Sequence, residues 1–248
     1  VWVPSKRVAV EFNGLYWHSE TCLPERDYHD MKTAQAAAAG VRLFHVFEDE
    51  WRDRRPVVES MLRACLGLTS ERHDARKLSL ERLDPAALCQ FFTDNHLDGF
   101  ARSEVGFGLV DGTGRVLSAA VIRRPFHRRA RAGDMEIARL CSAKDTSVRG
   151  AVGRLLRACA SYARDAGCQR LMTFVDARHG DGHGYQAAGM VRGSDTGLRF
   201  WWTDGRHRYN RFKYRADPAR HMTEAQVAHE AGVFRLWGCH NMTFSLLL

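Results

Sequence analysis

The 248-residue sequence lacks several features that would place it in a specialised class of protein. No apolar run reaches the roughly 18 residues that a membrane-spanning helix needs, and no basic, apolar and small-residue leader opens the chain. No internal repeat or low-complexity tract occurs. These absences predict a globular protein of the cytoplasm, with no membrane partner.

Cysteine pairs are also lacking. The seven cysteines form neither a Cys-x-x-Cys pair nor a Cys/His series with zinc-site spacing. An odd number of cysteines, scattered through apolar patterns, is typical of reduced thiols in a cytosolic core. Structural zinc is therefore not expected. The length is sufficient for one large domain or two ordinary ones.

Acidic residues are scarce in the second half of the chain, which carries most of the formal net charge of +8. Residues 1–75 contain 10 Lys/Arg and 12 Asp/Glu, which gives a net charge of −2. Residues 115–215 contain 21 Lys/Arg and 8 Asp/Glu, which gives a net charge of +13. This asymmetry fits a metal-binding catalytic half followed by a phosphate-binding half. The alternative is a basic protein whose charges are merely solvated.

Hydrophobic periodicity and turn residues predict two α/β domains. The first, residues 1–67, has two strands by residue 12, a helix over 27–39, a strand over 41–47 and a helix over 55–66. Residues 68–79 are polar and are predicted to be a linker. The second domain, residues 80–248, has helices over 85–95 and 149–166 and strands over 105–110, 116–122, 135–141 and 170–175. A short helix over 185–188 and a C-terminal helix and strand complete it.

One group of side chains in the first domain suggests chemistry. Glu11 lies near the end of a buried strand, where a charge is costly unless it is paired or binds a metal. His18 follows the strand, and His29 and Lys32 project from one side of the next helix. Such a group suits Mg²⁺-assisted phosphodiester hydrolysis. The alternative is a salt-bridged strand glutamate beside packed aromatic residues.

The segments EFNGLYWHSE and KTAQAAAAGVRLFHVFEDEW resemble phage and mobile-element homing endonucleases related to the very-short-patch repair endonucleases. These enzymes have a restriction-endonuclease-like fold, and the resemblance covers residues 1–67. It implies a Mg²⁺- or Mn²⁺-dependent endonuclease that acts on double-stranded DNA in a bacterial or phage-infected cell. The implied roles are metal binding by Glu11 and the Phe12 carbonyl, catalysis by Glu11, His18, His29 and Lys32, and insertion of Tyr16 and Trp17 into DNA. The family's leading metal-binding Asp would precede Val1, so either the sequence is a fragment, as its start at Val1 suggests, or the protein lacks this residue and binds DNA without cutting it.

The second domain resembles the GNAT acetyltransferase-like domain found in the same phage endonucleases. The similar segments are FFTDNHLDGF, MEIARLCS, SVRGAVGRLLRACASYARDAG and DARHGDGHGYQAAGM. The resemblance implies that Tyr185 could protonate the departing thiolate of coenzyme A. However, the loop from Arg149 to Gly153 is one residue shorter than Arg/Gln-x-x-Gly-x-Gly and lacks its central glycine. Acetyl-coenzyme A is therefore not expected to bind.

Two basic clusters suggest instead that this domain positions DNA. The candidate contacts are Arg123, Arg124, Arg128, Arg129, Arg206, Arg208, Arg211 and Lys213. Guanidinium groups suit phosphates, and the interleaved aromatic rings can stack on bases. The sequence thus predicts a metal-dependent DNA endonuclease. Its rivals are an acyltransferase or DNA-modifying enzyme that uses acetyl-coenzyme A, and a DNA-binding protein without catalysis.

Overall fold

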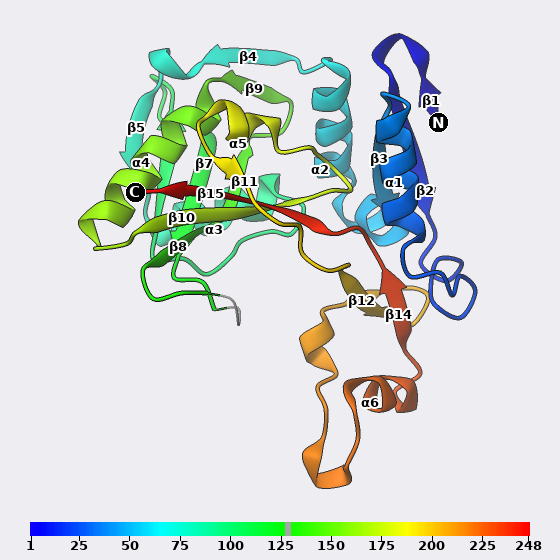
Figure 1. Ribbon diagram of the computed structural model, residues 1–248. Coiled ribbons are helices and arrows are strands. Elements are labelled where there is room, and N and C mark those ends of the chain that lie inside the picture. Colours follow the sequence, from blue (N-terminus) through cyan, green and yellow to red (C-terminus); the bar gives the residue numbers. More distant parts are fainter. Residues whose placement is uncertain (127–129) are drawn as a thin grey trace. The chain divides into compact units, whose positions relative to one another are not determined.

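The computed structural model describes residues 1–126 and 130–248, which form two compact units (Figure 1). Unit 1 comprises Val1–Arg55, Asp176–Gly180 and Asp195–Asn241, and unit 2 comprises Pro56–Val175, Asp181–Ser194 and Met242–Leu248. Both contain helices and strands, which confirms the predicted α/β class. The division differs from the predicted boundaries, because the chain returns to unit 1 after residue 175.

Unit 1 contains two three-stranded sheets, β1-β2-β3 and β13-β12-β14. Its strands are β1 Trp2–Val3, β2 Val8–Asn13, β3 Arg42–Phe47, β12 Phe200–Thr203, β13 Arg208–Tyr209 and β14 Phe234–Trp237. Its helices are α1 Tyr28–Ala38, α6 Glu224–Glu230, the start of α2 Glu48–Leu66, and the 3₁₀ turns η1 Pro4–Lys6, η3 Arg211–Lys213 and η4 Pro218–Arg220. Strands β2 and β3 are parallel, and α1 connects them. Leu15, Phe47 and Leu236 are buried together between these segments.

Unit 2 is built on a seven-stranded sheet in the order β11-β15-β10-β8-β7-β6-β5. The strands are β5 Ser79–Arg82, β6 Val105–Val110, β7 Val116–Arg123, β8 Asp134–Ser142, β10 Arg170–Asp176, β11 Val191–Arg192 and β15 Asn241–Leu247. A separate parallel pair joins β4 Glu71–Asp74 to β9 Thr146–Arg149. The helices are α3 Pro85–Asn95, α4 Ala151–Asp165, α5 His183–Ala187, the end of α2 and the 3₁₀ turn η2 Ala75–Lys77.

Helices α3 and α4 cover opposite faces of this sheet. A Cβ added to Gly106 on β6 would lie 2.6 Å from the Leu88 side chain of α3. The next residue, Phe107, contacts Tyr162 of α4, with 6.3 Å between the ring centroids. Because successive strand residues point to opposite faces, the two helices sandwich the sheet.

Two helix boundaries show how local sequence determines these elements. Asp84 accepts hydrogen bonds from the N–H groups of Ala86 and Ala87, both at 2.9 Å, so α3 begins at Pro85, as predicted. Helix α2 begins at Glu48 instead of residue 55, and its backbone departs from helical geometry at Arg54, shortly before Pro56. Within the described residues, no helix is long and apolar enough to cross a membrane.

Candidate functional site

Strands β8 and β10 begin as a parallel pair in the middle of the unit 2 sheet. Their register runs from Arg170 opposite Asp134 to Thr173 opposite Ile137, and both strands continue beyond it. The buried Thr173 hydroxyl donates a hydrogen bond of 3.1 Å to the Ile137 carbonyl at that point. Helix α4, which precedes β10 in the chain, packs its buried face against this sheet.

The N-terminus of α4 has no side-chain cap. Gly150 occupies the N-cap position with φ of +82°, a left-handed conformation that favours glycine, and Ala75 packs 3.7 Å from where a Cβ would lie. Among the described residues, no acceptor contacts the N–H groups of Ala151, Val152 and Gly153. Free N–H groups at the positive end of a helix dipole attract an anion.

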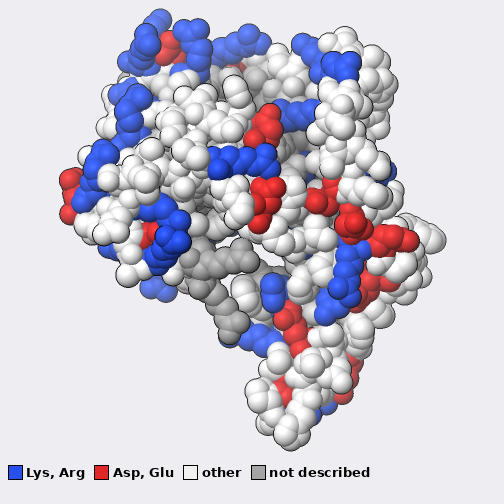
Figure 2. Space-filling model, in the orientation of Figure 1, with Lys and Arg blue, Asp and Glu red and all other residues white. Residues whose placement is uncertain are grey.

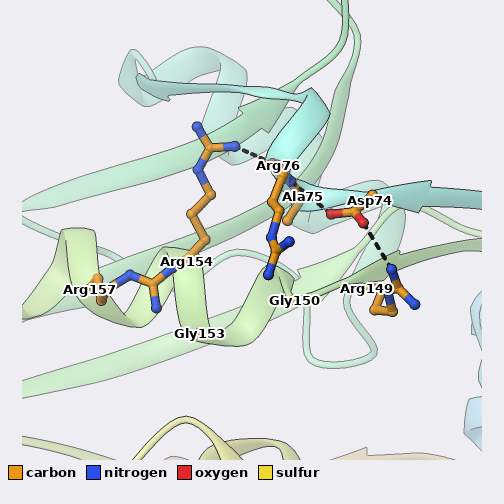
Figure 3. Close-up of a pocket in the computed structure, with 8 residues that line it drawn as sticks. All are labelled: Asp74, Ala75, Arg76, Arg149, Gly150, Gly153, Arg154 and Arg157. Atoms are coloured by element: carbon orange, nitrogen blue, oxygen red, sulfur yellow. Dashed lines mark hydrogen bonds and ion pairs between the residues drawn. The ribbon is translucent and has the colours of Figure 1, made fainter.

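A pocket of about 330 Å³ opens at this helix end (Figure 3). It is lined by residues from β4, η2, the end of β9 and the start of α4 with its N-cap: Asp74, Ala75, Arg76, Arg149, Gly150, Gly153, Arg154 and Arg157. Four of these eight residues are arginines, so positive charge dominates the pocket. Figure 2 shows basic side chains along the edge of unit 2 where β4 lies in Figure 1.

The four arginines differ in what they contact. Arg149 donates to the Asp74 carboxylate at 3.1 Å, and Arg154 donates to the carbonyls of Ala75 and Leu78. Within the described part of the chain, the guanidinium groups of Arg76 and Arg157 contact no acceptor. Two positive charges are therefore available to a ligand, beside the three free N–H groups of α4.

Tyr185 on α5 lies near the point where β8 and β10 lose their register. Burial of its hydroxyl raises the pKa of Tyr185 to about 12, although a hydrogen bond with Thr173 acts in the opposite direction. Its ring stacks on Phe244 of β15, with 6.0 Å between centroids. Helix α5 also packs on the first turn of α4, since Val152 lies 3.5 Å from where a Cβ of Gly184 would be. The hydroxyl thus keeps its proton at neutral pH.

The side chains that were predicted to cut DNA gather in unit 1. Glu11 forms an ion pair with Lys32, and its other carboxylate oxygen lies 3.2 Å from His45 Nδ1. Partial burial raises the pKa of Glu11, but the proximity of His45 and Lys32 outweighs it and lowers the value to about 2. His29 is buried with its ring 5.2 Å from that of His18, and burial lowers its pKa to about 3. The structure brings the four predicted residues together, and their catalytic roles stay predictions.

The predicted Mg²⁺ or Mn²⁺ site is not supported by this arrangement. The Glu11 carboxylate is paired with two cationic or hydrogen-bonding side chains, and the neighbouring Phe12 side chain is 55% exposed. Across residues 1–126 and 130–248, no group of three or more His, Cys, Asp or Glu side chains has a geometry that could hold a metal ion.

The predicted DNA contacts fall in both units. Tyr16 and Trp17 are 52% and 71% exposed in unit 1. In the same unit, the Arg208 side chain forms ion pairs with Asp49 and Glu50, and Arg211 forms one with Glu224. The Lys213 ammonium group lies over the Tyr209 ring. The Arg206 backbone N–H donates a hydrogen bond to Asp204. In unit 2, Arg123 pairs with Glu136 and Arg124 donates to the Ala166 carbonyl. Arg128 and Arg129 lie outside the described residues. DNA as a partner stays a prediction.

Sequence reasoning missed the pocket residues Asp74, Arg76, Arg154 and Arg157. Asp74 and Arg76 fall in the predicted linker, which in fact forms β4, η2 and the start of β5. The available signal was the spacing of Arg154 and Arg157, three residues apart and hence on one face of the predicted helix. Asp74 and Arg149 are far apart in sequence and meet only because β4 pairs with β9.

No family model and no curated protein matches the chain. Among solved structures it is similar to an IAA acetyltransferase from Bacillus cereus, at 14% identity and a TM-score of 0.39, covering 69% of this chain and 99% of that one. It is also similar to a Bacillus subtilis acetyltransferase in complex with CoA, at 14% identity, a TM-score of 0.42 and coverages of 69% and 99%. A third similar structure is a GNAT family acetyltransferase from Elizabethkingia anophelis with acetyl-CoA bound. Its sequence identity is 12% and its TM-score is 0.41, and the match covers 69% of this chain and 99% of that one.

These comparisons correct the predicted activity. The structures that resemble the chain are acetyltransferases, so the predictions of a homing-type DNA endonuclease, of a restriction-endonuclease-like domain and of Mg²⁺ or Mn²⁺ as the cofactor are not upheld. Two of these three structures have CoA or acetyl-CoA bound, a cofactor that the sequence was not expected to bind. At such identities and TM-scores, the bound ligands are properties of those proteins.

Proposed function

We propose that unit 2 binds the thioester of coenzyme A and transfers its acyl group to a nucleophilic acceptor. The observation that carries this proposal is the pocket at the N-terminus of α4, which is lined by two uncommitted arginines and by Gly153, the last of three α4 residues with free backbone N–H groups. Helix N-termini and guanidinium groups are both suited to phosphate oxygens.

The pocket fits the diphosphate of coenzyme A by charge and by hydrogen-bond donors. Arg76 and Arg157 supply two positive charges for the two charges of a diphosphate diester. The N–H groups of Ala151, Val152 and Gly153 belong to the backbone, so they are present although the loop lacks a central glycine at position 151. The shortened glycine loop therefore still provides the donors that a diphosphate needs.

Acetyl-coenzyme A, when bound, would supply a thioester whose sulfur leaves with a negative charge as the acyl group is transferred. Tyr185 holds a proton at its hydroxyl at physiological pH, as an ordinary phenol does, and could donate it to the leaving sulfur. Proton donation by a positioned side chain contributes about 10²- to 10⁴-fold to a rate. Thr173 and Phe244 fix the hydroxyl and the ring of this tyrosine, respectively.

Calorimetric titration with coenzyme A tests the proposal. Arg76→Gln and Arg157→Gln should each weaken binding by roughly ten- to a hundredfold, because a hydrogen bond to a charged group contributes about 1.5–3 kcal/mol. Arg102→Gln is the matched control, since Arg102 is an exposed arginine of unit 2 that does not line the pocket. The proposal fails if the wild-type protein does not bind coenzyme A, or if the control variant loses as much affinity as the pocket variants.

A further inference from the structure

We propose that Asp74 determines which phosphate ligands the α4 pocket accepts, favouring a diphosphate diester over a terminal triphosphate. This inference rests on the proposed function and assigns a specificity to the same site. It follows from the position of one carboxylate among four arginines.

The backbone fixes Asp74 in the pocket. Strand β4 pairs with β9 so that Asp74 lies opposite Arg149 in the parallel register. One carboxylate oxygen accepts a hydrogen bond of 3.0 Å from the Arg76 N–H, and the other accepts one of 3.1 Å from the Arg149 guanidinium (Figure 3). The hydrogen bonds from Arg76 and Arg149 hold the pKa of Asp74 below its usual range, so the carboxylate is charged at neutral pH.

Two of the four arginines in the pocket already contact an acceptor within the described part of the protein, and the other two do not. Arg149 is neutralised by Asp74, and Arg154 is directed at two backbone carbonyls. Arg76 and Arg157 remain, and their two charges equal those of a diphosphate diester. A terminal triphosphate brings about four negative charges to the same place, and the Asp74 carboxylate repels each of them.

The size of this effect is modest because the pair is open to solvent. The Arg149 side chain is 88% exposed and that of Asp74 is 29% exposed. Two unit charges about 4 Å apart in bulk water interact by an amount equivalent to roughly a fivefold change in affinity. Asp74 should therefore alter the preference between ligands of different charge by about threefold, without abolishing binding.

The test compares dephospho-coenzyme A with ATP, by calorimetry at low salt and without divalent ions. Both probes carry adenosine, but the first presents a diphosphate diester and the second a terminal triphosphate. Asp74→Asn should raise the affinity for ATP by about tenfold and that for dephospho-coenzyme A by about threefold. Asparagine can still accept the hydrogen bond from the Arg76 N–H, so the η2 turn is kept.

Asp111→Asn is the matched control. Asp111 is also an aspartate of unit 2 that accepts hydrogen bonds from nearby backbone N–H groups, in the turn between β6 and β7, but it does not line the pocket. This variant should leave the ratio of the two affinities unchanged. An equal ratio in Asp74→Asn and the wild type would overturn the inference and leave the proposed function standing. Wild-type protein that binds neither probe nor coenzyme A would overturn both.

Discussion

Tyr185 is held by three different parts of unit 2. Its hydroxyl contacts Thr173 of β10, its ring stacks on Phe244 of β15, and its carbonyl accepts the Met190 N–H at 3.0 Å. Gly182 makes the ring contact possible, because a Cβ at that position would lie 2.1 Å from the Phe244 ring. A side chain fixed at both ends is suited to deliver a proton to one place.

Replacing this tyrosine tests the proposed proton donor. Tyr185→Phe should lower the rate of CoA release from acetyl-CoA by about 10²-fold, with primary amines supplied as acceptors and CoA quantified by chromatography. The affinity for coenzyme A should not change, because the phenol hydroxyl lies apart from the phosphate pocket. Tyr162→Phe on α4 is the control and should retain the wild-type rate. A Tyr185→Phe protein that turns over as fast as the wild type would remove this residue from the mechanism.

At the scale of elements, the sequence predicts those helices and strands that are determined by neighbouring residues, through hydrophobic periodicity and turn residues. The helices predicted over 85–95 and 149–166 are both present, as α3 and α4. The segment over 68–79 was misjudged, because β4 is a polar strand whose partner, β9, follows some 70 residues later. Tyr185 was recognised, but the arginines around α4 were not, since nothing local brings Arg76 to that helix.

The sandwich of α3 and α4 around the sheet depends on the absence of a side chain at Gly106. Gly106→Ala would place a methyl group 2.6 Å from Leu88 and 2.8 Å from Val121, so we expect a loss of about 1–3 kcal/mol in the free energy of unfolding. Gly112→Ala is the control, because nothing lies within 4 Å of its added Cβ. Urea denaturation measures both. Equal stability of the two variants would contradict the packing described for α3.

At the scale of the whole molecule, a second ligand class is predicted for unit 1. Residues 206–215 contain five Lys or Arg and no Asp or Glu, and the same unit exposes Tyr16 and Trp17. This combination is typical of surfaces that contact phosphates and bases. Replacing Arg208 would test this surface poorly, because the Arg208 side chain is only 12% exposed and forms ion pairs with two buried or half-buried carboxylates.

Binding to double-stranded DNA should therefore depend on salt through the other basic residues of this segment. Replacing Arg206, Arg211 and Lys213 together by Gln should weaken binding and flatten the slope of log K against log salt by about one for each lost contact. A triple Gln variant of Lys77, Arg102 and Arg164 removes the same charge from unit 2 and is the control. If both triple variants shift the slope equally, general charge and not this segment determines DNA binding.

The central claim, that the α4 pocket holds the diphosphate of coenzyme A, is tested most directly by an experimental structure of the protein with coenzyme A. The account predicts phosphate oxygens at about 3 Å from the N–H groups of Val152 and Gly153, with the guanidinium groups of Arg76 and Arg157 beside them. The thiol end should lead toward Tyr185. Coenzyme A bound elsewhere on the protein, or an α4 pocket that holds no diphosphate at a saturating concentration of coenzyme A, would contradict this claim.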